Sequence, residues 1–223
     1  MFHPSGGLTY HLRAWRYRDA LWRPFHEQVG RWLTAWRPGA VHLVLAGPSG
    51  GYALNREFLE RFQRVTVLEP DPLARRILGW RFSSISFEFA VSPLAGPGGF
   101  AALAQAWPGA AFLFCNLLGQ TLVGQGEDFE RAAWLAELEP ALAGREWASW
   151  HDLASTERAP DQSRPFRLNH AQALEAVLAH LWQGGELTIR DHECEGLCPH
   201  SAREYALWNL RPGHWHLVEW LHA

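Results

Sequence analysis

Short apolar runs alternate with helix-like segments along most of the chain, and this alternation limits the fold more than any other feature of the sequence. Six runs have the length of a β-strand: 41–46, 65–68, 85–91, 111–118, 146–153 and 186–194. Five intervening segments have the pattern of a helix: 55–62, 71–80, 100–107, 127–142 and 169–182. Strands that alternate with helices of this length predict βαβ units and a parallel sheet with helices on both faces.

The two ends of the chain depart from this alternation. Residues 205–223 contain two apolar runs around Arg211-Pro212-Gly213, which predicts an antiparallel hairpin. Residues 15–37 predict a helix, because large apolar side chains recur at spacings of three and four: Trp22, Phe25, Val29, Trp32 and Trp36. We therefore expect one α/β domain with a doubly wound, mostly parallel, seven-stranded sheet. Residues 1–39 would be an N-terminal helical extension of a Rossmann-like core at 40–223.

The composition narrows the classes of partner. The chain has 223 residues, of which 48% are hydrophobic, enough for one sizeable core. Its net charge of −3 gives no basic excess that would indicate nucleic acid or an anionic membrane as a partner. Lysine is absent, which excludes a Schiff-base lysine and a Walker lysine. Three cysteines do not indicate a disulfide framework, and no apolar run approaches the roughly 20 residues that span a bilayer, so we expect a cytoplasmic protein.

A glycine-rich turn follows the first predicted strand in the stretch "HLVLAGPSGGYAL". In a doubly wound sheet, ligands bind beyond the carboxyl ends of the strands, near the point where the strand order reverses. The next predicted strand ends at Glu69, 22 positions after Gly47, where an acidic residue can accept hydrogen bonds from ribose hydroxyls. Asp71-Pro72 then has the residues of a helix start. This spacing predicts a nucleoside site.

The same turn leaves two other interpretations open. Residues 47–51 also fit the G-x-S-x-G pattern of a hydrolase nucleophile elbow, with Ser49 as the nucleophile. Such an elbow needs an earlier strand and loop for half of its oxyanion hole, and the residues before Ser49 look helical. Alternatively, the turn only packs, and the protein is a non-catalytic binding module.

Three stretches, "HLVLAGPSGGYAL", "VTVLEPDPLARRIL" and "AAFLFCNLLGQ", together with the predicted hairpin, resemble the class I S-adenosylmethionine-dependent methyltransferases. The resemblance implies an enzyme that uses S-adenosylmethionine to methylate a small-molecule acceptor. It implies the following cofactor contacts: Gly47, Pro48, Ser49, Gly50, Gly51 and Tyr52 at the methionine part, Glu69 with Asp71 at the ribose, Ala90 and Val91 at the adenine, and Asn116 and Leu117 near the methyl group. The chain departs from the family in its turn, which has only part of the usual pattern of three alternating glycines.

Ionisable side chains at two later strand ends are candidates for catalysis. His151 and Asp152 end the fifth predicted strand, and Asp191 and His192 end the sixth. Parallel strands place these ends on the same rim as the glycine turn. A histidine there can act as a general base, oriented by a neighbouring carboxylate. We expect His151, Asp152, His192 and Asn116 in catalytic roles; the alternative is that they cap strands and bond loop amides.

The segment "HECEGLCPH" raises the question of a metal site. Its possible ligands for zinc are His192, Cys194, Cys198 and His200. Their spacing matches none of the common zinc signatures, so we expect free cysteines and no metal there.

Overall fold

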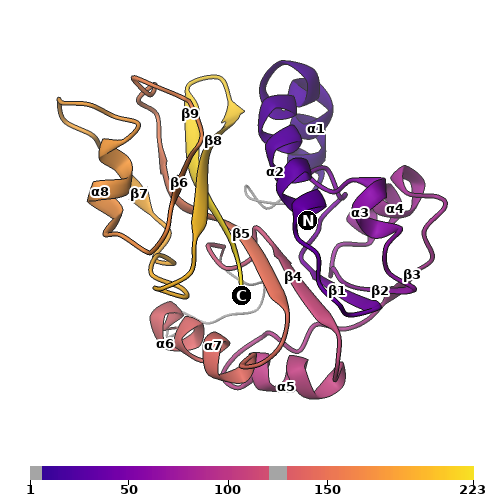
Figure 1. The fold of residues 1–223 in the computed structure, drawn as a ribbon. Helices are drawn as coiled ribbons and strands as arrows, with labels where there is room; N and C mark the ends of the chain where they lie inside the picture. Colours follow the sequence, from indigo (N-terminus) through magenta and orange to yellow (C-terminus); the bar gives the residue numbers. More distant parts are fainter. Residues whose placement is uncertain (1–6, 121–129) are drawn as a thin grey trace.

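The computed structural model describes residues 7–120 and 130–223 (Figure 1). In this part of the chain nine strands form one sheet: β1 His42–Ala46, β2 Arg64–Leu68, β3 Phe87–Phe89, β4 Ala111–Cys115, β5 Trp147–Thr156, β6 Phe166–Leu168, β7 Arg190–Asp191, β8 Arg203–Arg211 and β9 His214–His222. The helices are α1 Gly7–Tyr17, the π-helical turn η1 Arg18–Trp22, α2 Arg23–Ala35, α3 Arg56–Leu59, α4 Pro72–Arg81, α5 Gly99–Ala106, α6 Arg131–Ala136, α7 Leu138–Ala141 and α8 Leu174–Ala179.

The first half of the sheet is parallel and doubly wound. The strand order is β3-β2-β1-β4-β5-β9-β8-β6, so β1 pairs with β2 on one side and with β4 on the other. The chain order therefore reverses at β1, which makes the turn after β1 the topological switch point of the sheet. All five residues of β4 are buried, as expected for a strand with helices on both faces.

The predicted terminal hairpin is present and extends the sheet. Strand β9 lies between β5 and β8 and is antiparallel to both. The pairing of β5 with β9 shifts register between Asp152 and Ala154. Asp152 lies directly before this irregularity, and its neighbour His151 belongs to a different buried network, as described below.

Two hydrophobic clusters cover the two faces of the sheet. The N-terminal helices pack on one face, where Trp22 and Phe25 are fully buried and Phe25 stacks on Trp208 of β8 with ring centroids 5.1 Å apart. Burying a side chain such as Phe25 contributes about 2–3 kcal/mol to folding. Helices α5 to α8 cover the opposite face with residues such as Phe100 and Trp134. Figure 1 shows α1 and α2 standing between the β8–β9 hairpin and the part of the chain with α3 and α4.

Several predicted elements differ from the structure. The sheet has nine strands and not seven: the six predicted runs and the two strands of the hairpin already make eight, and the polar segment that ends at residue 168 adds β6. The predicted parallel strand at 186–194 is wrong: only β7 forms there, antiparallel to β5, because this charged segment lies at an edge and pairs through two residues. In the second half of the sheet, strand β8 runs parallel to β5, because both are antiparallel to β9.

The helix boundaries also need correction. The N-terminal helical region begins at Gly7, well before residue 15, and changes to α2 where Pro24 occupies the first turn. Helix α8 begins at Leu174, so Asn169 is not its N-cap. The helix predicted at 127–142 appears as α6 and α7; its first residues lie outside the described part of the chain. No helix within 7–120 and 130–223 is long and apolar enough to cross a membrane.

Candidate functional site

The glycine turn lies at the switch point and is packed tightly against α4. Gly47 and Gly51 have φ angles of +67° and +68°, which favour glycine. A Cβ atom on Gly50 would lie 2.8 Å from Ile77, and one on Gly51 would lie 2.5 Å from Leu78 Cδ1. The last two glycines are therefore required by their contact with α4.

Glu69 fixes this turn to the end of β2. Its Oε2 accepts a hydrogen bond from the Ser49 N–H at 2.8 Å, and its Oε1 accepts one from the Asp71 N–H at 3.0 Å. Burial raises the pKa of the Glu69 carboxyl, although the two hydrogen bonds act in the opposite direction. Each carboxylate oxygen keeps a second lone pair, so Glu69 can still accept a hydrogen bond from a ligand.

Helix α1 covers this edge through two side chains that the sequence analysis did not single out. His11 Nδ1 lies 2.7 Å from the Tyr52 hydroxyl, and His11 Nε2 lies 3.7 Å from Asp71 Oδ2. The pKa of Tyr10 is raised by burial and further by the nearby carboxylates of Asp152 and Glu69. Tyr10 is half-buried, with its ring centroid 5.8 Å from that of Tyr52 and 6.5 Å from that of Trp208. No spacing in the sequence indicates this placement.

The other predicted cofactor residues lie at the ends of β3 and β4. Val91 is 87% exposed, and the Ala90 N–H donates to the Val67 carbonyl. Leu117 packs against Gly47, where a Cβ would lie 3.1 Å from Leu117 Cδ1. Asn116 has a φ angle of +53°, which turns the chain out of the sheet directly after β4. The turn after β1 and the start of the turn after β4 are thus in contact.

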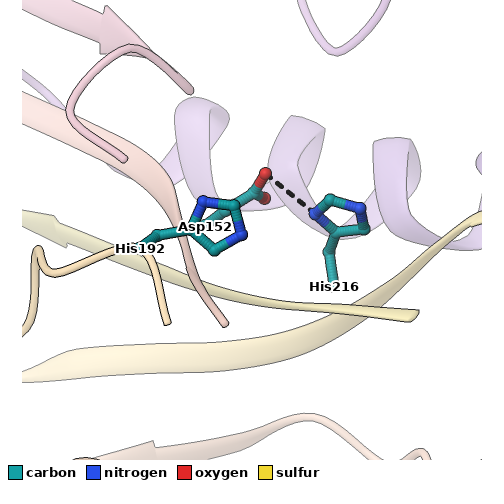
Figure 2. Close-up of side chains that lie close together, drawn as sticks. All are labelled: Asp152, His192 and His216. Atoms are coloured by element: carbon teal, nitrogen blue, oxygen red, sulfur yellow. Dashed lines mark hydrogen bonds and ion pairs between the residues drawn. The ribbon is translucent and has the colours of Figure 1, made fainter. Parts of the chain in front are cut away.

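Asp152 is the centre of a buried polar cluster beside Asn116. The Asp152 N–H donates to Asn116 Oδ1 at 2.9 Å, and Asn116 Nδ2 donates to Asp152 Oδ2 at 3.1 Å. His216 of β9 lies with Nδ1 2.9 Å from the same Oδ2. Figure 2 shows the carboxylate of Asp152 between the rings of His192 and His216. Burial acts to raise the pKa of Asp152, but the facing His216 and His192 and the hydrogen bond from Asn116 leave it below its usual value.

His192 completes this cluster from the segment that follows β7. Its Nδ1 lies 3.0 Å from the Gly119 carbonyl and its Nε2 lies 3.4 Å from the Ser155 hydroxyl. Burial lowers the pKa of His192, and Asp152 acts to raise it. Asp152, His192 and His216 each offer one possible ligand atom, and these atoms all lie within 4.8 Å of one another. His216 was missed because only the pairing of β5 with β9 brings it to Asp152.

The sheet has both features that the sequence resemblance implies, a doubly wound parallel part and a closing antiparallel hairpin. Its strand order places the glycine turn at the switch point and the hairpin at the opposite end from β3.

The similarities of this chain to known proteins are distant. No family model and no curated protein sequence matches the chain. Among solved structures, the N-methyltransferase NodS from Bradyrhizobium japonicum in complex with S-adenosyl-L-homocysteine (SAH) is 14% identical, with a TM-score of 0.47, and the match covers 97% of this chain and 98% of that one. DhpI in complex with SAH is 16% identical, with a TM-score of 0.43 and coverage of 95% and 92%. Magnesium protoporphyrin IX methyltransferase from Synechocystis with bound SAH is 14% identical, with a TM-score of 0.44 and coverage of 90% and 83%.

The sequence suggested that His151 acts together with Asp152. In the structure, His151 lies outside the Asp152 cluster. Successive side chains of a strand point to opposite faces, and His151 is fully buried on the face away from Asp152. There its Nδ1 lies 3.0 Å from the Ser149 hydroxyl and its Nε2 lies 3.4 Å from Glu219 Oε1. Glu219 also pairs with the buried Arg203 at 3.1 Å. The sheet therefore separates two neighbouring residues: Asp152 lies in the polar cluster with Asn116, and His151 lies in a core network with Glu219 and Arg203.

The possible zinc set of the sequence is not brought together. Cys194 Sγ donates to the Asp152 carbonyl at 2.9 Å, His200 is exposed, and the three cysteines are free. Among the described residues, the set whose ligand atoms meet is Asp152, His192 and His216.

The nucleophile elbow also finds no support in the described residues. The hydrogen bond to Glu69 comes from the Ser49 backbone, and no histidine bonds the Ser49 hydroxyl within 7–120 and 130–223. The helix after the turn begins only at Arg56, so Ser49 does not lie at a sharp strand-to-helix turn.

Proposed function

We propose that this chain is an S-adenosylmethionine-dependent methyltransferase with a small-molecule acceptor. The observation that carries the proposal is the bond between Glu69 at the end of β2 and the glycine turn after β1, at the switch point of the sheet. This is where a doubly wound sheet binds a nucleoside and where an acidic side chain meets the ribose.

The cofactor residues have separate roles in this proposal. Glu69 accepts hydrogen bonds from the ribose hydroxyls, with Asp71 next to it. The turn from Gly47 to Tyr52 contacts the methionine part. Ala90 and the exposed Val91 flank the adenine, since they follow β3 on the neighbouring strand end.

The acceptor would bind beside Asn116 and Asp152, because the turn after β4 touches the glycine turn while Asn116 bonds Asp152. Methyl transfer is an in-line displacement: the acceptor atom forms a bond to the methyl carbon, the bond from that carbon to the sulfonium sulfur breaks, and SAH leaves. A hydroxyl or protonated amine acceptor also loses a proton to the cluster or to water. Positioning supplies most of the rate enhancement in such a reaction.

Calorimetric titration with S-adenosylmethionine, SAH and NADH tests the proposal after any copurified ligand is removed. We expect the first two compounds to bind and NADH not to bind. Glu69→Gln should weaken binding of SAH by at least about tenfold, because hydrogen bonds to a charged carboxylate contribute about 1.5–3 kcal/mol. Glu88→Gln is the matched control, since Glu88 is an exposed carboxylate on β3 that pairs with Arg64. Equal SAH affinity of Glu69→Gln and wild type would remove Glu69 from the site.

One observation favours a non-catalytic binding module as a second candidate. Gly50 and Gly51 of the turn are required by packing on α4, and the half-buried Tyr10 of α1 has its ring centroid 5.8 Å from that of Tyr52. Failure of the folded protein to bind any of the three nucleoside compounds would favour this function. The cytoplasm remains the proposed location, since the three free cysteines fit a reducing compartment.

A further inference from the structure

We propose that Asp152, His192 and His216 bind one divalent transition-metal ion at the carboxyl edge of the sheet. The three residues come from β5, from the segment after β7 and from β9, so the site forms only in the folded sheet. Asp152 is 3% exposed and His216 is 8% exposed. Their ligand atoms and that of His192 lie within 4.8 Å of one another.

Two atoms of this cluster are buried without a hydrogen-bond partner in the described part of the chain. They are Asp152 Oδ1 and His216 Nε2. Leaving a buried polar atom unpaired costs about 1–3 kcal/mol, and more for a charged group. Since one carboxylate oxygen of Asp152 is fully bonded and the other is not, the carboxylate retains the capacity to bind a cation.

Neighbouring groups orient two of the three ligands, His192 and Asp152, by hydrogen bonds, as the groups around the ligands of a metal ion do. The Gly119 carbonyl can only accept a hydrogen bond, so His192 Nδ1 must carry the proton at that contact. A neutral His192 then presents Nε2 as a bare nitrogen. Asn116 holds Asp152 by two hydrogen bonds and fixes the direction of its carboxylate.

The donor set decides the class of ion. Two imidazoles and one carboxylate suit zinc or ferrous iron, whereas magnesium and calcium take oxygen ligands. Ligand atoms on one tetrahedral ion lie about 3.4 Å apart, given bonds of about 2.1 Å. One ligand atom from each of the three residues lies within 4.8 Å of the other two, and the rings of His192 and His216 have centroids 6.0 Å apart. Small side-chain rotations can therefore bring the three ligands onto one ion.

The role of the ion rests on the proposed methyltransferase function. Three protein ligands leave at least one coordination position open. An acceptor oxygen bound there would lie next to Asn116, and a metal-bound hydroxyl ionises more readily than a free one. The inferred acceptor class is therefore a small molecule with a hydroxyl or carboxylate that can coordinate a metal.

Cobalt titration of untagged protein, stripped of metal with a chelator, tests the site. Co²⁺ reports nitrogen and oxygen ligation by its visible absorption, and Zn²⁺ should displace it. We expect one Co²⁺ per chain in the wild type, loss of the spectrum in Asp152→Asn and in His192→Ala, and at least about tenfold weaker binding in Asn116→Ala. His200→Ala, which changes an exposed histidine of the same segment, is the matched control and should bind as the wild type does.

Far-UV circular dichroism identifies variants that fold, and Asp152→Asn preserves size where an alanine variant does not fold. Absence of Co²⁺ and Zn²⁺ binding in the folded wild type, or an unchanged spectrum in folded Asp152→Asn and His192→Ala, would overturn the metal site and leave Asp152 and His216 as a proton-accepting pair. The titration requires neither S-adenosylmethionine nor an acceptor. Its failure is therefore distinguishable from failure of the cofactor calorimetry.

Discussion

Glu219 is 1% exposed and lies between Arg203 of the neighbouring strand β8 and His151 of β5. Arg203 also donates hydrogen bonds to the carbonyls of Leu197 and Cys198, so it ties the loop before β8 to the sheet. Removing one partner of a buried ion pair leaves the other charge without compensation. Replacing one residue of this core network therefore destabilises the protein by more than the loss of that residue's own contacts.

Glu219→Gln should lower the free energy of unfolding by about 3–5 kcal/mol, because it leaves the buried Arg203 guanidinium without its counter-ion. Urea unfolding measures this directly. Glu88→Gln removes an exposed ion pair with Arg64 and should leave the unfolding midpoint nearly unchanged. Similar losses in the two variants would contradict the role of the buried pair.

Glu219 should also contribute to the pH dependence of stability. Burial acts to raise its pKa, but His151 and Arg203 hold the pKa of the carboxyl below the ordinary value of 4.5. The unfolded chain then binds a proton at a pH where the folded protein does not. The stability contributed by Glu219 is therefore complete above about pH 4.5 and is lost as the pH falls through the lower folded-state pKa. Urea unfolding series between about pH 6 and pH 3 should show a steeper loss for wild type than for Glu219→Gln; parallel curves would contradict the lowered pKa.

At the scale of elements, the glycine turn packs on α4, and each of the two contains a glycine. We expect replacement of these two glycines to have opposite effects on stability. Gly51 has a φ angle of +68°, and an added Cβ would lie 2.5 Å from Leu78. Gly79 is within α4, and an added Cβ would have nothing within 4 Å. The turn needs its glycine, whereas the helix does not.

Gly51→Ala should therefore lower the free energy of unfolding by at least about 1–3 kcal/mol, from backbone strain and from overlap with Leu78. Gly79→Ala should raise it by about 0.5–1 kcal/mol, because alanine favours a helix interior. Thermal and urea unfolding of the two variants provide the comparison. A neutral Gly51→Ala would mean that the turn does not pack on α4 as described.

At the scale of the whole molecule, the sequence predicted those structural features that depend only on residues close together along the chain. The Asp71 N-cap of α4, the turn after β1 and the terminal hairpin are of this kind. The contact of Asp152 with His216 depends on the pairing of two strands about 60 residues apart, with a register shift beside Asp152. The position of Tyr10 depends on where an entire helix packs. Neither the contact with His216 nor the position of Tyr10 can be predicted from the local sequence pattern. The sequence therefore suggested His151 as the partner of Asp152, whereas in the structure the partner is His216.

The position of β9 has a consequence for how the protein is made. Ribosomes synthesise β9 after every other described strand, yet it lies in the middle of the sheet, between β5 and β8. Until β9 emerges, the ten-residue strand β5 has an open edge on the nascent chain, and such an edge is a template for wrong pairing. The N-terminal parallel half can form during translation, but the second half must wait for its central strand. Holdase chaperones should therefore engage this chain at β5, in the interval after β5 has been synthesised and before β9 has emerged.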